Sequence, residues 1–270
     1  MKIQNFESFN KKLILYYYCY DFDNNILHMS TPIHIDQLID GEWKPVDITP
    51  EEFAKIRKSD NWKNRNDNVK LTFQEFRDTG PRGNKAFLED AKKAVLNGDF
   101  GPSFKDFINT LINGNIFLII TARGHEPETM KHFVKWLICN YMTPKQREKM
   151  FKNLKKFQKL FDSEDISIRS YLDTCEFVGI MSEYFINTYG KDMESNNNVE
   201  KGKEVVVNDF LHRLEKFATK VGAKLKVGFS DDDESTVKHM TDFFKEKDLD
   251  VAVDYYIFDT SNKGKEKVKI

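Results

Sequence analysis

Along the chain, short apolar runs alternate with longer stretches in which apolar residues recur at helical spacing. The short runs are typical of buried strands in a parallel sheet, and the recurring positions are typical of amphipathic helices. The predicted core strands are Leu13–Tyr20, Ile116–Ile120, Phe177–Ile180, Leu225–Phe229 and Val251–Phe258. The predicted helices begin at or near Pro50, Asn84, Ser103, Pro127, Pro144, Lys203 and Glu234. Strands that alternate with helices in this way indicate an α/β fold.

The segment after the first strand carries the signals of a β-hairpin followed by a helix. Residues Ile26–Ile48 alternate imperfectly and contain Asp40-Gly41, a dipeptide typical of tight hairpin turns. Thr49-Pro50-Glu51-Glu52 combines an N-cap threonine, a proline at the first helical position and the glutamate of a capping box. The polar stretch 59–83 is expected to consist mainly of loops, with one short element at 69–76.

Composition and charge limit the functions to be considered. The 270 residues carry a net charge near −1, which argues against a general nucleic-acid coat but allows local basic patches. Cys19, Cys139 and Cys175 show no metal-type spacing, which suits buried thiols in a reducing compartment. The first residues lack a signal-peptide pattern, and the longest apolar runs are far too short to span a membrane. We therefore expect a soluble, cytoplasmic protein.

Polar side chains follow three of the predicted strands at the point where each strand ends. Asp21 and Asp23 follow the first, Thr121 ends the second, and Asp231 and Asp232 follow the fourth. Because the carboxyl ends of parallel strands meet at one edge of a sheet, we expect these residues to share a site. So much negative charge requires a divalent cation, and oxygen ligands without histidine or cysteine favour Mg²⁺. Carboxylates with Mg²⁺ indicate phosphate chemistry, in which one carboxylate attacks phosphorus and another transfers protons.

With these clusters in order, the sequence resembles the haloacid-dehalogenase-like (HAD) phosphohydrolase superfamily. That family has a hydrophobic strand ending in DxD, matched by YYYCYDFDNN, and a strand ending in threonine or serine, matched by IFLIITARG. It continues with a lysine before a helix, matched by VEKGKEVVV, and a strand ending in paired acids, matched by LKVGFSDDD. The resemblance spans roughly Leu13 to Phe258.

The resemblance implies a role for each matching residue. Asp21 would be the nucleophile and a Mg²⁺ ligand, and Asp23 would be the general acid and base, with its backbone carbonyl on the metal. Thr121 would bind the phosphate. The lysine that neutralises the phosphoryl charge would be Lys201, which is followed by glycine as in many family members, or as second choice Lys203. The metal site would be completed by Asp231 and Asp232.

One residue departs from the family pattern. Asn25 stands two residues after the second aspartate, where the family commonly has threonine or valine. Since asparagine keeps a hydrogen-bonding group, this departure predicts reduced or altered activity.

The fold that follows is a Rossmann-like, three-layer core around a parallel sheet, with a β-hairpin flap and helical cap insertions. The core is assigned to residues 11–27, 101–125 and 200–260. The flap and its insertion are assigned to 28–100 and a helical insertion or cap to 126–199, while 261–270 is expected to be a frayed tail. The insertions would cover the site and select the substrate, as cap segments do in this family.

The expected activity is Mg²⁺-dependent hydrolysis of phosphomonoesters through an aspartyl-phosphate. The phosphorylated substrate could be a small molecule or a nucleic-acid end. The alternative is a binding or structural subunit of a larger assembly that keeps the fold without turnover. Two features allow either a binding role or a plain structural one: Arg123 and His125 beside Thr121, and the exposed-looking tryptophans Trp43 and Trp62. The lysine-rich helix over 145–159 could contact a polyanion, although its pattern favours a solvated face.

Overall fold

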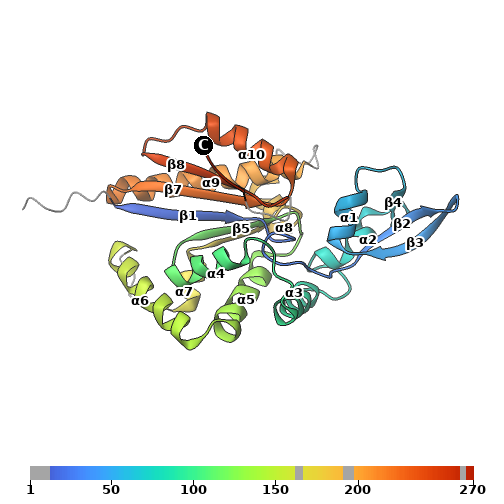
Figure 1. Cartoon of the computed structure of the whole chain (residues 1–270), viewed down its shortest axis with the longest axis horizontal. Coiled ribbons are helices and arrows are strands. Elements are labelled where there is room, and N and C mark those ends of the chain that lie inside the picture. The colour runs from blue at the N-terminus through green and yellow to red at the C-terminus, as the bar shows by residue number, and fades with distance from the viewer. Residues whose placement is uncertain (1–12, 162–166, 191–197, 262–265) are drawn as a thin grey trace, which may run out of the picture.

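The computed structural model describes residues 13–161, 167–190, 198–261 and 266–270. Its main sheet consists of β1 Ile14–Tyr20, β5 Phe117–Thr121, β6 Glu176–Gly179, β7 Lys224–Asp231, β8 Val253–Asp259 and β9 Glu266–Lys269. These six strands lie in the order β6-β5-β1-β7-β8-β9 (Figure 1). Neighbouring strands are parallel, except that β9 is antiparallel to β8. The fold is therefore α/β, with a mixed and mostly parallel sheet.

One face of the sheet packs against helices from the middle of the chain. They are α3 Lys85–Asn97, α4 Phe104–Asn113, α5 Pro127–Trp136, the π-helical turn Leu137–Tyr141, α6 Pro144–Phe161 and α7 Ile168–Asp173. Phe117 and Ile119 of β5 point into this layer, together with Phe107 of α4 and Phe133 of α5. Because β-strand side chains alternate, Leu118 points to the opposite face. The central strand is thus buried on both sides, as its continuous apolar sequence predicts.

The opposite face packs against α8 Glu183–Tyr189, α9 Val199–Val221 and α10 Glu234–Glu246. The longest of these, α9, buries a stripe that includes Val206, Val207 and Phe210. These residues recur at helical spacing and contact the sheet side chains of β1, β5 and β7 in one cluster. The two helical layers with the sheet between them form a three-layer core (Figure 1).

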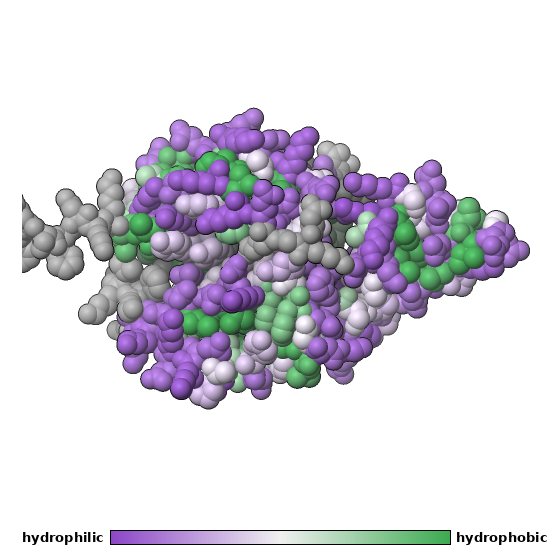
Figure 2. All heavy atoms as spheres, viewed as in Figure 1, coloured by the Kyte–Doolittle hydropathy of each residue, from purple (hydrophilic) through white to green (hydrophobic). Residues whose placement is uncertain are grey.

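A smaller unit projects beyond the carboxyl ends of the main strands (Figure 1). Its sheet has the order β3-β2-β4. The unit consists of β2 Ile33–Ile39, β3 Glu42–Ile48, α1 Pro50–Ile56, β4 Trp62–Asn64, the 3₁₀ turns Arg65–Asp67 and Gln74–Phe76, and α2 Val69–Thr72. Figure 2 shows apolar patches on the surface of this unit, where Leu38, Ile39 and Trp43 are exposed.

Two local predictions in this unit are confirmed. Asp40 and Gly41 both have positive φ, 54° and 81°, which is the geometry of the tight turn between β2 and β3. Thr49 and Glu52 form the capping box of α1. The strand β4 was not predicted, because three residues are too few to show a period.

Two other segments differ from the expectation. Residues 126–199 were expected to form a helical insertion or cap, but they include β6, an edge strand of the main sheet, and α5 packs in the core. Within 28–100, α3 also belongs to the core. The end of the chain, expected to be frayed, pairs with β8 over residues 266–269, because alternate residues there meet the rings of β8. Residues 1–12, which include the first two residues assigned to the core, lie outside the described residues.

Across the part of the chain that the structure describes, no helix combines the length and the apolar character that a membrane span requires. The three cysteines are free thiols, and two of them, Cys19 and Cys175, are buried.

Candidate active site

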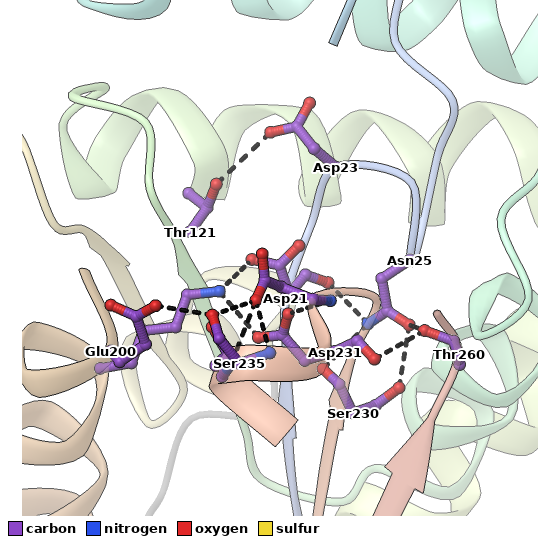
Figure 3. Close-up of polar contacts among 12 residues, drawn as sticks. Asp21, Asp23, Asn25, Thr121, Glu200, Ser230, Asp231, Ser235 and Thr260 are labelled. Carbon is purple, nitrogen blue, oxygen red and sulfur yellow. Dashed lines mark hydrogen bonds and ion pairs between the residues drawn. The ribbon is translucent and has the colours of Figure 1, made fainter. Parts of the chain in front are cut away.

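The centre of the site is a lysine that lies between two aspartates from different strands. Lys203 Nζ is 2.7 Å from Asp21 Oδ1 and 2.7 Å from Asp231 Oδ2. Asp21 follows β1 and Asp231 ends the neighbouring strand β7, so the parallel pairing of these strands brings the two carboxylates together. All three side chains are buried. Figure 3 shows the cluster at the carboxyl edge of the sheet, as the sequence predicts.

Burial and the neighbouring acids disfavour the charged forms of the carboxylates in this cluster. Burial raises the pKa of Asp21 well above its ordinary value, Lys203 opposes this shift, and the nearby Asp231 and Asp232 add to it. Burial also raises the pKa of Asp231. The pKa of Asp232 rises to about 7, first through burial and then through Asp231. One buried lysine therefore does not balance three neighbouring acids, and a further cation would stabilise their charged forms.

The lysine that reaches the site is Lys203, and the first choice made from the sequence, Lys201, does not reach it. Lys201 is exposed and pairs with Glu204 on the surface of α9. The helix begins at Val199, so residues 201 and 203 are separated by about 200° around its axis. Lys203 lies three and four residues before the buried Val206 and Val207, on the face that packs against the sheet. The apolar period of this helix could have identified Lys203.

Asp23 and Thr121 form a second group beside the first. The Thr121 hydroxyl donates to Asp23 Oδ2 over 3.5 Å. Arg123 binds the same carboxylate through two nitrogens: Nε donates to Oδ2 at 2.7 Å and Nη2 donates to Oδ1 at 2.6 Å. The intervening Phe22 is fully buried against Phe87 and Phe133, which anchors the loop and separates the directions of the two aspartates. Thus Asp21 contacts Lys203 while Asp23 contacts Arg123.

Arg123 is the residue whose importance was least visible in the sequence. Its side chain is only 1 % exposed and its guanidinium lies 4.2 Å from the centre of the Phe76 ring. It also donates to the Thr31 hydroxyl at 3.2 Å, so it connects the segment before β2 to the end of β5. Among its nitrogens, Nη1 is buried without a hydrogen-bond acceptor. An arginine that is held in this way fixes the position of Asp23.

His125, the other residue singled out beside Thr121, is enclosed by core side chains. Its ring is fully buried and lies 5.0 Å from the centre of the Phe87 ring. Burial, together with the charges of Arg123 and Arg77, lowers the pKa of His125 to about 2. The imidazole is therefore neutral and belongs to the core.

Asn25, the departure from the family pattern, has a structural role. Its amide donates to the backbone carbonyls of Asp21 at 3.0 Å and Ser230 at 3.1 Å. Its oxygen accepts from the hydroxyls of Ser230 at 2.9 Å and Thr260 at 3.0 Å (Figure 3). A methyl group at Gly101 would lie 2.4 Å from the Asn25 carbonyl oxygen, so the chain there must be glycine. Asn25 thus joins the loops after β1, β7 and β8 beneath the site.

Three of the acidic residues could hold a cation together. Ligand oxygens of Asp21, Asp231 and Asp232 all lie within 4.8 Å of one another among the residues described. A donor set of carboxylate oxygens, without a cysteine or histidine, fits Mg²⁺. The carboxylate of Asp23 is turned to Arg123, and the assignment of its backbone carbonyl to the metal stays a prediction.

The small unit contacts the rim of this site. Arg57, at the end of α1, pairs with Asp233, the N-cap residue of α10 that follows the paired acids. The pKa of Asp233 is lowered although burial opposes this, because Ser235 and Arg57 bind its carboxylate. By contrast, Trp62 packs against Phe53 within the small unit, and Trp43 is stacked with Lys63 away from the acids.

Comparison with protein-family models, with curated proteins and with solved structures finds no match for this chain. The functional argument therefore rests on the residues of the site and their geometry.

Proposed function

We propose that the protein hydrolyses phosphomonoesters with the help of Mg²⁺, through an aspartyl-phosphate formed on Asp21. The observation that supports this most directly is the buried Asp21–Lys203–Asp231 cluster at the carboxyl edge of the sheet. A carboxylate oxygen of Asp232 lies within 4.8 Å of oxygens of Asp21 and Asp231, and the proton-transfer candidate Asp23 follows Asp21 by two residues. When bound, Mg²⁺ would supply positive charge to the carboxylates and to the phosphoryl oxygens.

In the first half of the reaction, a carboxylate oxygen of Asp21 attacks phosphorus. The bond between phosphorus and the ester oxygen breaks, and the departing oxygen takes a proton from Asp23. Lys203 and the Thr121 hydroxyl would bind phosphoryl oxygens as negative charge moves onto them. The products of this half are a free alcohol and the phosphorylated Asp21.

In the second half, Asp23 accepts a proton from a water molecule whose oxygen attacks the phosphorus. The bond between phosphorus and Asp21 breaks, which releases inorganic phosphate and restores the Asp21 carboxylate. Both oxygens of Asp23 are bonded to Arg123 in this structure. Asp23 must therefore release one of these bonds in order to carry the proton.

The same contact is the observation that favours the alternative function. A chain that keeps Asp23 permanently paired with Arg123 would bind a phosphorylated ligand or an assembly partner without turnover.

The experiment that separates these functions is hydrolysis of a generic aryl phosphate with and without Mg²⁺. We expect Mg²⁺-dependent turnover in the wild type and a loss of about 1,000-fold or more in Asp21→Asn, because the nucleophile is removed. The exposed Asp248→Asn is the matched control and should keep wild-type activity. Acid-quenched protein should carry phosphate on Asp21. No turnover over a broad panel of phosphate esters would reject the enzyme, and equal rates for the wild type and Asp21→Asn would reject the nucleophile.

A further inference from the structure

A second surface of the protein combines aromatic rings with lysines on one face of the main sheet. The face is opposite to α9 and α10 and extends over β1, β7, β8 and β9, beyond the helices that cover β5 and β6. Tyr16 and Tyr18 of β1 point to it, as do Tyr256 and Phe258 of β8. Tyr16 is 42 % exposed, and the other three rings are half-buried. An open row of rings on a sheet is unusual, because such rings would normally be covered.

Lysines from β7 and β9 lie over these rings. Lys267 Nζ is 4.3 Å from the centre of the Tyr256 ring and 5.5 Å from that of Phe258. Lys269 lies 5.9 Å from the Tyr256 ring, and Lys226 lies 5.6 Å from the Tyr16 ring. The pattern follows from the register, since Lys269 is opposite Tyr256 and Lys267 is opposite Phe258. The ammonium groups and the rings thus share one accessible surface.

The charge of this face is positive, although the chain as a whole is nearly neutral. Four lysines belong to it, since Lys224 joins the three that lie over rings. Asp254 on the same face is already bonded to Lys224 at 2.7 Å and to Lys269 at 3.0 Å. Among the described residues, Asp106 of α4 is a second acid here, and it lines the hollow described below. A positive excess therefore remains for an anionic partner.

A hollow between the rings completes the surface. Its volume is about 170 Å³, and it lies between Tyr18 and Phe258 with Gly228 as its floor. A methyl group on Gly228 would lie 3.0 Å from each of these two rings, so glycine keeps the hollow open. Asn109 and Asn113 of α4 form the opposite wall with amide groups. The hollow is smaller than the pockets of about 300 Å³ or more that take drug-sized ligands, and it suits a single planar ring.

We propose that this face binds a single-stranded nucleic acid, with bases on the aromatic rings and phosphates on the lysines. The accessible parts of the rings offer the bases of a single strand a stacking surface, and the backbone of the strand provides one negative charge per nucleotide for the lysines. The asparagine amides can bind the hydrogen-bonding edge of a base in the hollow. A duplex does not fit this surface, because its bases are already stacked on one another. A protein partner would be expected to meet an apolar patch rather than a row of lysines.

The proposal does not depend on the phosphatase activity. It does connect the two sites, because Ser230 lines the hollow and is followed directly by Asp231 of the acidic cluster. A strand on this face would therefore pass beside the edge of the candidate active site.

The test is fluorescence anisotropy of labelled single-stranded oligonucleotides of about 12 nucleotides, DNA and RNA, with the full chain in EDTA. We expect binding that is weaker for the duplex of the same sequence. Removing one ring, in Tyr16→Ala or Tyr256→Ala, should weaken binding by about 5- to 150-fold, since stacking on an aromatic ring contributes about 1–3 kcal/mol per base. Tyr16→Phe and Tyr256→Phe keep the stacking surface and should bind nearly as well as the wild type. The exposed Tyr184→Ala on α8 is the matched control.

The lysines are tested by salt dependence. Lys267→Ala/Lys269→Ala should flatten the slope of log K against log salt concentration by about 0.7 for each lost phosphate contact, while Lys238→Ala on α10 should leave it unchanged. Asp21→Asn should bind like the wild type, which separates this proposal from the proposed catalysis. The proposal is overturned if no single strand binds at low salt, if a duplex binds equally well, or if Tyr16→Ala and Tyr256→Ala bind like Tyr184→Ala.

Discussion

Replacing Lys203 with methionine would leave two buried carboxylates without the cation they share. Lys203 is 3 % exposed, and the partners Asp21 and Asp231 are 5 % and 1 % exposed, so water cannot take its place. Removing one member of a buried ion pair costs about 3–5 kcal/mol, and we expect Lys203→Met to lose this much free energy of unfolding. For a domain of this size the loss corresponds to a fall in Tm of about 6–20 °C.

Lys201→Met is the matched control, two residues away on the same helix. The Lys201 side chain is 52 % exposed and its pair with Glu204 lies on the surface. Surface ion pairs contribute at most about 1 kcal/mol, so the Tm of Lys201→Met should be close to that of the wild type. The two variants therefore differ only in whether the lysine faces the carboxylates.

Acidification should reduce the deficit of Lys203→Met. The pKa values of Asp21 and Asp231 are raised by burial, and losing the lysine removes the contact that opposes this rise. A group whose pKa is raised in the folded state contributes stability below its ordinary pKa and loses it as the pH rises through the folded pKa. As the pH falls, the buried carboxyls of the variant therefore take up protons more readily than ordinary aspartates, and neutral carboxyls need no cation.

The assay is thermal unfolding followed by circular dichroism in metal-free buffer with EDTA, at pH 5 and pH 8. The reasoning is refuted if the free energy of unfolding of Lys203→Met at pH 8 is within about 1 kcal/mol of the wild-type value, since the loss of a buried ion pair predicts a larger difference. It is also refuted if Lys201→Met loses as much, or if the deficit of Lys203→Met grows towards pH 5.

Four further predictions follow from the same site. Mg²⁺ at 100 times its Kd should add about 2.7 kcal/mol to the free energy of unfolding of the wild type at pH 8 and so raise its Tm. It should not raise the Tm of Asp231→Asn. Because the pKa of Asp232 is raised to about 7, stability without metal should fall as the pH rises from about 4 through 7, and the effect of Mg²⁺ should grow over that range; calorimetry with and without EDTA measures both. Asn25→Ala should cost about 2–4 kcal/mol, measured by urea unfolding, because it removes the buried hydrogen bonds of the Asn25 amide to the Asp21 and Ser230 carbonyls and those of its oxygen to two hydroxyls; loss below about 0.5 kcal/mol would show that the network is dispensable. Arg123→Met should release Asp23 and change the pH dependence of kcat on an aryl phosphate more than it changes KM, and an unchanged pH profile would contradict its positioning role.

The strands and most helices were predictable because their signals are local. Continuous apolar runs identified β1, β5 and β7, and the turn and capping residues identified the β2–β3 hairpin and α1. The polar residues at the strand ends were predictable as one site, because parallel strands must bring their carboxyl ends to one edge. The position of Lys203 was also present in the sequence, in the period of Val206, Val207 and Phe210, once the start of α9 is known.

What the sequence by itself determined was therefore the type of fold and the acids at its edge. Only the tertiary structure decided how the side chains pair, because partners such as Asp23 and Arg123 are 100 residues apart and Asn25 and Ser230 are 205 residues apart. It also decided that the strand predicted at 177–180 lies at the edge of the main sheet and not in a cap, and that the face of β8 and β9 carries lysines over rings. The physical reason is that a strand or helix depends on neighbours in the chain, whereas ion pairs and buried hydrogen bonds depend on which surfaces the packed core brings within about 3 Å of one another.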